Sequence, residues 1–219
     1  MKKHKILPAI LCGAILLSMA GCGQTTPATS TQSEAPTEGT TTEATTEATT
    51  EAPTETEATV PDNSDDIFVS AYPAFAVTSQ SLHDGKWDEI TANTLDGKNA
   101  SPELSWEPVE GATEYAIYMI DMDTGYFIHW KSGNIKETTL PEGWAPKSEY
   151  IGPYPPSGST HHYTVYVIAL KAPVERMKGG INSIYAKVKD FIDALDTDAE
   201  GNTGNIVGVG RVSGAYTAK

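Results

Sequence analysis

The C-terminal part of the chain, residues 67–219, contains apolar and aromatic runs with the composition of β-strands. Residues 115–120 and 163–170 are apolar enough to be central strands of a sheet. Residues 67–72 predict a short strand, and residues 206–216, which contain three glycines, predict a last strand with bulges or close packing. This length is sufficient for one hydrophobic core. The pattern therefore predicts a single, mainly β domain.

One segment of this domain has helical periodicity. Two glycines at 179 and 180 precede it, and a polar loop at residues 196–204 follows it. Its apolar residues recur at three- and four-residue spacing, at Ile181, Ile184, Val188, Phe191, Ile192 and Leu195. The spacing predicts a helix over residues 181–195.

The first residues have the pattern of a lipoprotein signal peptide. Residues 2–5 carry three lysines, and the apolar run at residues 6–19 is about 14 residues long, short of the roughly 20 that a membrane-spanning helix needs. The run ends in Met-Ala-Gly-Cys at residues 19–22, which resembles the lipobox of bacterial lipoproteins. We therefore expect residues 1–21 to be removed and Cys22 to carry a diacylglycerol.

Cysteine usage limits the chemistry of the mature chain. The chain has two cysteines, Cys12 inside the signal peptide and Cys22 at the expected lipidation site. The mature domain then has no thiol, which excludes disulfides, thiolate metal sites and cysteine nucleophiles. We expect the protein to be lipid-anchored at the cell membrane and to face the extracytoplasmic side.

Residues 22–66 have the composition of a tether. Residues 23–66 hold ten of the 29 acidic residues and contain no Lys, Arg, Trp, Phe or Tyr, and a Thr-Thr-Glu-Ala repeat runs through residues 41–52. Such a segment has too little apolar surface to fold, and its like charges repel one another. The composition predicts a disordered, extended tether between the anchor and the domain.

The charge of residues 67–219 excludes one class of partner. These residues carry 19 acids against 12 bases, seven net negative charges. Without a basic stripe there is no counterion release to drive nucleic-acid binding. No cofactor is expected, and the sequence names no protein partner. The expected partners are the membrane, through the lipid anchor, and a small ligand.

Three polar segments carry the chemistry of the domain, and their joint order is more informative than any one of them. They are Asn99-Ala100-Ser101-Pro102-Glu103-Leu104-Ser105-Trp106, Asp121-Met122-Asp123 followed by His129-Trp130, and the segment from Gly152-Pro153-Tyr154-Pro155-Pro156 to His161-His162-Tyr163. In this order they resemble the phosphatidylethanolamine-binding protein family, in its bacterial Raf-kinase-inhibitor-like branch. Asn134 and the closing Gly214-Ala215-Tyr216 extend the resemblance over essentially all of residues 67–219.

The resemblance implies both a fold and a site. The fold would have a large antiparallel sheet, a smaller second sheet and one or two peripheral helices. The site would be a small pocket for phosphate-like or carboxylate groups between the motif loops. Carried over position by position, the ligand-binding residues would be Asp121, His129, Tyr154, Pro156, His161 and Tyr163, with the backbone around residues 154–156 as one wall.

The chain departs from the family pattern in two places. The family's Asp-Pro-Asp-Ala-Pro is Asp-Met-Asp-Thr-Gly at residues 121–125, so both prolines that stiffen the loop are lost. His162 stands where the family has Arg, and strand alternation predicts that it faces away from the pocket.

These residue types suit an anion. Two imidazoles, a phenol and backbone N–H groups supply directed hydrogen-bond donors. A carboxylate at Asp121 bonded to a ring nitrogen would fix the tautomer, raise the pKa of the imidazole and leave the other N–H for the ligand. We therefore expect His129 and His161 to be largely cationic at neutral pH. The sequence predicts a binding module for a small anionic ligand, such as a phospholipid headgroup, and not an enzyme.

Two alternatives remain from the residues, and the family resemblance suggests a third. Asp121, His129 and His161 would suit a hydrolytic zinc site, although they lack the helical spacing of such sites. Ser157 or Ser159 would be a nucleophile with His161 as base, although no Gly-x-Ser-x-Gly elbow is present. An inhibitor of an extracellular protease or another interaction protein is the third.

Overall fold

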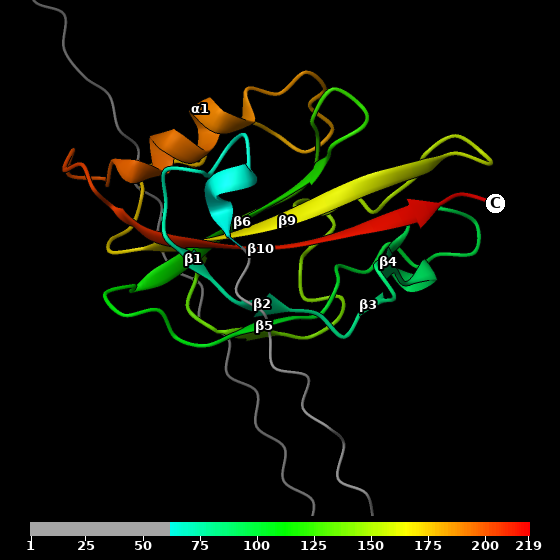
Figure 1. The fold of residues 1–219 in the computed structure, drawn as a ribbon, viewed down its shortest axis with the longest axis horizontal. Coiled ribbons are helices and arrows are strands. Elements are labelled where there is room, and N and C mark those ends of the chain that lie inside the picture. The colour runs from blue at the N-terminus through cyan, green and yellow to red at the C-terminus, as the bar shows by residue number, and fades with distance from the viewer. Residues whose placement is uncertain (1–61) are drawn as a thin grey trace, which may run out of the picture. The chain divides into compact units, whose positions relative to one another are not determined.

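The structure is a computed structural model that describes residues 62–219. The expected signal peptide, Cys22 and residues 23–61 of the expected tether lie outside the described residues. Over the described part the fold is mainly β, with a seven-stranded sheet and a three-stranded sheet (Figure 1). The predicted fold class is confirmed.

The large sheet has the strand order β3-β4-β10-β9-β6-β7, and β1 also pairs with β10. Its central strands β10, β9, β6 and β7 are antiparallel, as predicted, whereas the two-residue strands β1 and β4 run parallel to β10. The strands of this sheet are β1 (Ala74–Phe75), β3 (Leu82–His83), β4 (Lys86–Trp87), β6 (Glu114–Asp121), β7 (Phe127–Ile135), β9 (Thr160–Leu170) and β10 (Ile206–Thr217).

The smaller sheet has the order β2-β5-β8, and the helical elements are short. Its strands are β2 (Val77–Thr78), β5 (Leu104–Trp106) and β8 (Thr139–Leu140). The helical elements are the α-helix α1 (Val188–Asp193) and the 3₁₀ turns η1 (Asn63–Asp65), η2 (Glu89–Thr91) and η3 (Ala194–Asp196). Within the described residues, no helix has both the length and the apolar character needed to cross a bilayer.

The large sheet is covered on both faces, with α1 on one side and the small sheet on the other (Figure 1). Strand β9 is apolar at successive positions because both of its faces are buried. Tyr163 and Val165 belong to the core shared with the small sheet, whereas Tyr166 and Ile168 belong to the core beneath α1. A strand buried on both faces needs apolar residues at every position.

The glycines of β10 allow neighbouring segments to pack closely, as the sequence indicated. A Cβ at Gly210 would lie 2.4 Å from Val77 Cγ2, and one at Gly214 would lie 2.3 Å from Leu82 Cδ1. The side chains of Val77 on β2 and Leu82 on β3 therefore pack directly on the β10 backbone, where a larger residue would displace them.

The predicted helix over residues 181–195 is wrong in its first half. The helix begins at Val188, and residues 181–187 form turns that pair with the edge of β7. Asn182 N donates to Ile128 O, and Ser183 O accepts from Ile128 N, while Asn182 and Tyr185 have positive φ. Tertiary hydrogen bonds to a strand edge thus replace the helical bonds that the spacing predicted.

The predicted strand at residues 67–72 is also wrong. These residues form turns in which the Asp66 carboxylate accepts from the N–H groups of Phe68 and Val69, and both of those side chains are buried. A side-chain acceptor competes with strand pairing for these backbone donors.

The end of the expected tether, residues 62–66, is part of the folded domain. Asn63 and Asp66 are buried, and Arg211 on β10 forms ion pairs with Asp65 and Asp66. Asn63 Nδ2 also donates to Val209 O on β10, and the Tyr166 hydroxyl on β9 donates to Asp66, so these residues are anchored to the sheet although their acidic composition resembles that of the preceding segment.

Candidate functional site

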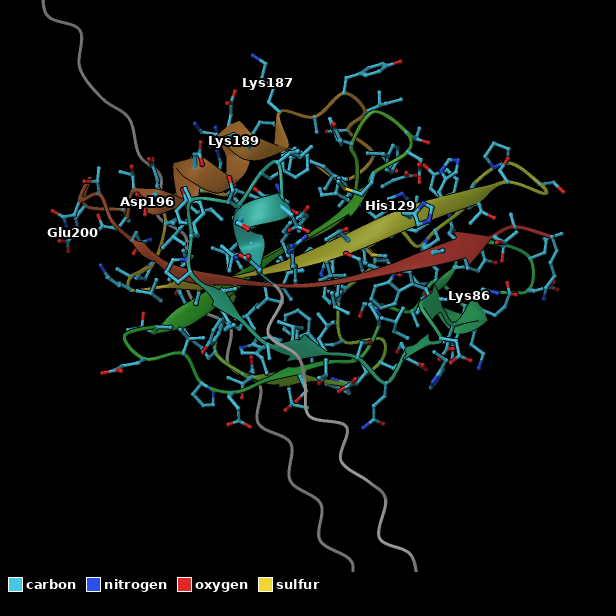
Figure 2. The ribbon with its side chains drawn as sticks, in the orientation of Figure 1. Lys86, His129, Lys187, Lys189, Asp196 and Glu200 are labelled. Carbon is cyan, nitrogen blue, oxygen red and sulfur yellow. The ribbon has the colours of Figure 1, made fainter. Side chains whose placement is uncertain are left out.

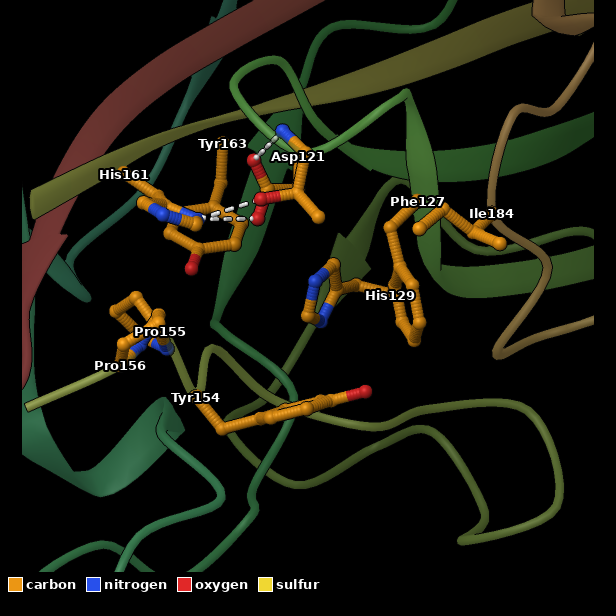
Figure 3. Close-up of a pocket in the computed structure, with 10 residues that line it drawn as sticks. Asp121, Phe127, His129, Tyr154, Pro155, Pro156, His161, Tyr163 and Ile184 are labelled. Atoms are coloured by element: carbon orange, nitrogen blue, oxygen red, sulfur yellow. Dashed lines mark hydrogen bonds and ion pairs between the residues drawn. The ribbon is translucent and has the colours of Figure 1, made fainter. Parts of the chain in front are cut away.

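All six sequence-predicted site residues line one cavity of about 470 Å³. The side chains of Asp121, His129, His161 and Tyr163 converge on it, and Tyr154, Pro155 and Pro156 form the opposite wall (Figure 3). The remaining lining residues are Thr124, Phe127 and Ile184. The volume suits a small ligand.

Two neighbouring strands bring the polar side chains together. Asp121, the last residue of β6, lies opposite Tyr163 in the ladder between β6 and β9. His161 is two residues from Tyr163 on β9, so both side chains point to the same face of the sheet. The intervening His162 points to the other side.

A β-bulge in β7 turns His129 toward the cavity. Met119 on β6 lies opposite Trp130, and Ile120 lies opposite Ile128, so that His129 has no partner across the ladder. In a regular strand His129 and Trp130 would face opposite sides, but a bulge lets both face the same side. Trp130 packs in the core that contains Tyr163, and the His129 and Tyr163 rings lie edge to face at 5.0 Å. Figure 2 shows His129 beside the yellow strand β9.

The Asp121 carboxylate is fully engaged at the end of β6. Its Oδ1 accepts from the N–H groups of Asp123 and Thr124, at 2.8 and 3.0 Å, and its Oδ2 lies 2.7 Å from Nδ1 of His161. Because an ionised carboxylate only accepts, Nδ1 of His161 carries the proton in this contact. Asp121 therefore orients the His161 ring (Figure 3).

The His129 ring is held by backbone carbonyls and not by a carboxylate. Its Nδ1 lies 2.7 Å from Ile151 O and 3.2 Å from Gly152 O. Carbonyl oxygens only accept, so Nδ1 is the protonated nitrogen and the ring's other nitrogen, Nε2, carries the lone pair when the ring is neutral.

Burial keeps His129 uncharged. The residue is 2% exposed, and burial lowers the pKa of His129 to about 4, outweighing the carbonyl hydrogen bonds and the charge of Asp121 that favour its cation. The expectation that both imidazoles are cationic at neutral pH is therefore wrong for His129. Desolvation of the imidazolium outweighs its attraction to the Asp121 carboxylate.

The segment that contains Asn99 holds the loop whose carbonyls contact His129. The Asn99 side chain accepts from Gly152 N at 2.6 Å, and Pro153 O accepts from Asn93 N at 2.9 Å. A Cβ at Gly152 would lie 1.9 Å from Thr91 O, so glycine is required there. These contacts fix the carbonyls that hold His129.

Tyr163 presents a buried hydroxyl without a partner. The residue has no exposed surface, and its Oη has no hydrogen-bond partner within residues 62–219. Burial, followed by the negative charge of Asp121, raises the pKa of Tyr163, so the phenol stays protonated. A buried donor left unpaired costs about 1–3 kcal/mol, which a bound acceptor would recover.

The chain was compared with known proteins. Residues 78–206, more than half of the chain, match the model of the family described as "Phosphatidylethanolamine-binding protein". The chain belongs to the phosphatidylethanolamine-binding protein family.

Relatives and solved structures of the family agree with this assignment. The chain is 36% identical to the "Putative lipoprotein LppC" of Mycobacterium tuberculosis, over 35% of this chain and 48% of that protein, so it spans about half the length of that relative. The fold resembles that of E. coli YbcL, described as a new member of the mammalian phosphatidylethanolamine-binding protein (PEBP) family. The TM-score is 0.50 and the sequence identity 25%, over 66% of this chain and 99% of YbcL. A PEBP homologue of Chlamydia trachomatis, CT736, shares the fold at a TM-score of 0.51 and 22% identity, over 65% and 97% of the two chains.

The loop at residues 121–125 lacks the two prolines of the family pattern, and hydrogen bonds to the Asp121 carboxylate hold it instead. The Asp121 carboxylate ties down the N–H groups of Asp123 and Thr124, which closes a tight turn. The Thr124 hydroxyl, absent from the family's usual Ala, lies 3.1 Å from Nδ1 of His161. Thr124 thus joins the polar group of the cavity, a position that the sequence comparison marked as a departure and not as a site residue.

Phe127 and Ile184 were not predicted at the site. Phe127 is two residues from His129 and its ring lies 4.7 Å from the imidazole, so strand alternation offered a signal for it. Ile184 had been assigned to a helix, and only the turn at residues 181–187 brings it to the cavity.

His162 is exposed and pairs with Asp123 on the surface, as strand alternation predicted.

The residues of the enzyme alternatives are not joined as those alternatives require. Ser157 Oγ donates to Lys219 O, and within residues 62–219 no hydrogen bond joins Ser157 or Ser159 to His161. Among the described residues, no three Asp, Glu, His or Cys side chains are grouped to hold a metal ion.

Proposed function

We propose that the domain binds a small oxyanion of the phosphate or phosphate-ester type in the Asp121–His161 cavity. The unpartnered Tyr163 hydroxyl carries this proposal, because it is a buried donor on a residue that lines the same cavity as His161. When His161 is protonated, Nδ1 serves Asp121 and Nε2–H is free to donate to a ligand. Two convergent donors in a site shielded from water favour an anionic acceptor.

The apolar wall indicates what is attached to the anion. Tyr154 and Ile184 are 41% and 49% exposed at the mouth of the cavity, and the Phe127 and Tyr154 rings lie edge to face at 5.7 Å. Such a rim suits the glycerol or acyl part of a phospholipid whose headgroup occupies the polar end. A free phosphate would use the polar end alone.

We propose that the domain works at a membrane surface as a lipid-anchored protein. The tetrapeptide at residues 19–22 supports lipidation of Cys22, and the relative LppC bears the name of a lipoprotein. Export through a signal peptide would place the domain on the extracytoplasmic side. An anchored domain would encounter phospholipid headgroups at high local concentration.

The alternatives have less support. A zinc hydrolase would need Asp121 to leave its three donors, and a serine hydrolase would need a serine beside His161. An inhibitory protein interaction would place a partner's side chain in the same cavity. A partner's phosphate or carboxylate would use the same donors, so the ligand chemistry is shared.

Calorimetric titration of the mature chain, with Cys22→Ser so that it carries no acyl group, tests the proposal. Inorganic phosphate, O-phosphoethanolamine and a short-chain lysophosphatidylethanolamine separate a free anion from a lipid headgroup. We expect at least one of the three ligands to bind.

Two histidine variants provide the matched control. His161→Ala should weaken phosphate binding about 10- to 150-fold, the range of one charge-assisted hydrogen bond. His162→Ala removes the same ring from a surface position beside Asp123 and should have little effect. Equal losses in the two variants, or no binding of any of the three ligands, would refute the proposal.

A further inference from the structure

The geometry points to a membrane-contacting surface at the mouth of the cavity, formed by the exposed side chains of residues 176–189. The partner of this 176–189 surface is a phospholipid bilayer that contains anionic lipid. The inference rests on the membrane location in the proposed function, and it adds the part of the domain that touches the lipid.

Exposed apolar side chains gather at the cavity mouth. Five large apolar side chains are exposed in the described residues, and two of them, Tyr154 and Ile184, line the cavity (Figure 3). A third, Tyr185, is 80% exposed, and its ring packs against Gly125 in the loop that carries Asp121. Apolar exposure that is concentrated at one place marks an interaction surface, whereas scattered exposed residues do not.

The turn that presents Ile184 and Tyr185 is held by the edge of β7. Asn182 N donates to Ile128 O at 3.0 Å, and Ile128 N donates to Ser183 O at 3.1 Å. Tyr185 has a φ of 55°, a conformation that bulky residues seldom adopt. The fold therefore keeps two large apolar side chains in contact with solvent at a fixed place beside the cavity.

Basic residues flank these apolar side chains. Residues 176–189 hold four of the 12 bases of residues 67–219 and no acid, and all four side chains are exposed. They are Arg176, Lys178, Lys187 and Lys189. Figure 2 shows Lys187 and Lys189 on the side of the domain where α1 lies. Aromatic, aliphatic and basic side chains on one surface are typical of segments that lie among lipid headgroups.

The four bases differ in their availability to a lipid phosphate. Lys189 pairs with Asp193 at 2.7 Å, and acidic side chains share a second cavity with Arg176 and Lys178. Lys187 forms no ion pair within residues 62–219, and it is two positions from Tyr185. Lys187 is therefore the base most available for contact with a headgroup.

Two arguments favour a bilayer over a protein as the partner. The surface borders the cavity proposed for a phospholipid headgroup, so both meet the same lipid. The expected tether from Cys22 has about 40 residues and a root-mean-square length of about 35 Å, which keeps the domain within reach of its own membrane. At physiological ionic strength charges are screened over about 8 Å, so the contacting segment outweighs the overall negative charge.

Co-sedimentation with vesicles of phosphatidylethanolamine and phosphatidylglycerol tests the surface in the mature Cys22→Ser chain. Tyr185→Ser should lower the partition coefficient about 10-fold, the lower end of the range for burying a large apolar side chain. Lys187→Gln should lower it about fivefold, the value of one basic residue at an anionic membrane.

Two exposed residues elsewhere provide matched controls. Leu95 is fully exposed but lies beside acidic side chains at another cavity, and Lys86 is on β4, away from Lys187 (Figure 2). Leu95→Ser and Lys86→Gln should therefore leave the partition coefficient nearly unchanged. Equal partition of all four variants, as expected if the surface binds a protein, would overturn the inference, and so would no partition of the unsubstituted chain.

Calorimetric titration of O-phosphoethanolamine on the same variants separates the surface from the cavity. Tyr185→Ser and Lys187→Gln should keep their affinity for this soluble ligand, because neither side chain lines the cavity. Retained affinity also shows that the variants are folded. An unsubstituted chain that partitions to vesicles but binds none of the soluble phosphate ligands would overturn the proposed anion site and leave the membrane-contacting surface standing.

Discussion

The Nδ1 atom of His161 lies 2.7 Å from Oδ2 of Asp121, although 40 residues separate them in the chain. The ladder between β6 and β9 places Tyr163 opposite Asp121, and β9 continues past the end of β6. His161 therefore lies beside the turn that follows Asp121. The contact holds the ring with Nδ1 toward the carboxylate and Nε2 available to the cavity.

Asp121→Asn should loosen the His161 ring without removing the site. The amide keeps the shape of the carboxylate but not its charge, so it holds Nδ1 of His161 less firmly than the carboxylate does at 2.7 Å. Phosphate affinity should fall about 10-fold, the lower end of the range for one charge-assisted hydrogen bond.

Calorimetric titration of phosphate at about pH 6 measures this loss. Asp123→Asn is the matched control, because Asp123 pairs with the exposed His162 outside the cavity and should change the affinity less. Unchanged phosphate affinity in Asp121→Asn would contradict the role assigned to the Asp121–His161 contact.

His129 should make the domain less stable in acid. Its pKa is about 4 when folded and about 6.5 when unfolded, so between these values the unfolded chain binds a proton that the folded chain does not. The free energy of unfolding should therefore fall as pH drops from about 6.5 to 4, by about 3 kcal/mol from this residue.

Urea unfolding at about pH 7 and pH 4.5 measures the effect. His129→Gln should flatten the pH dependence, because the neutral amide has no proton to gain. His83→Gln is the control, since His83 is exposed on β3. If the two variants show the same pH slope, His129 does not carry the linkage.

Asn99→Gly should destabilise the domain and weaken the site together. Asn99 has a φ of 54°, which glycine adopts without strain, so the substitution removes the side chain without penalising the backbone. Loss of its hydrogen bond to Gly152 N should cost about 1–3 kcal/mol of unfolding free energy.

Denaturant unfolding and phosphate titration on the same samples check this prediction. Asn99→Asp retains the acceptor oxygen and should lose less stability than Asn99→Gly. Asn99→Gly with full stability and full phosphate affinity would show that the Gly152 loop holds its position without this contact.

Cys22→Ala should detach the protein from the membrane. The lipobox cysteine is the expected acceptor of the diacylglycerol, and the described domain contains no helix able to span a bilayer. Fractionation should find the variant in the medium or as an uncleaved precursor. Normal processing with full membrane retention would rule out lipidation as the anchor.

The amino-acid sequence by itself determined the central strands and six of the residues that line the cavity. The continuous apolar run of residues 163–170 predicted a strand in the middle of a sheet, because an interior strand has two faces to bury. The motif order predicted that Asp121, His129 and His161 share a site, and they line one cavity. The strand depends on local composition, which a sequence displays directly, and the site residues follow from the resemblance of the motifs to a known family.

Tertiary structure decided the conformation of segments whose backbone groups hydrogen-bond to residues outside the segment. Residues 181–187 have helical spacing but form turns, because Asn182 and Ser183 hydrogen-bond to Ile128 on β7. Residues 67–72 have strand composition but turn around the Asp66 carboxylate. A local pattern cannot reveal a partner that lies elsewhere in the chain.

Tertiary structure also decided the chemistry at the cavity. The bulge in β7 turns His129 and Trp130 to the same face, which alternation alone would forbid. Burial against the carbonyls of Ile151 and Gly152 makes His129 a neutral acceptor, whereas its motif suggested a cationic donor. The charge of a histidine follows from its desolvation and its neighbours, and both exist only once the chain has folded.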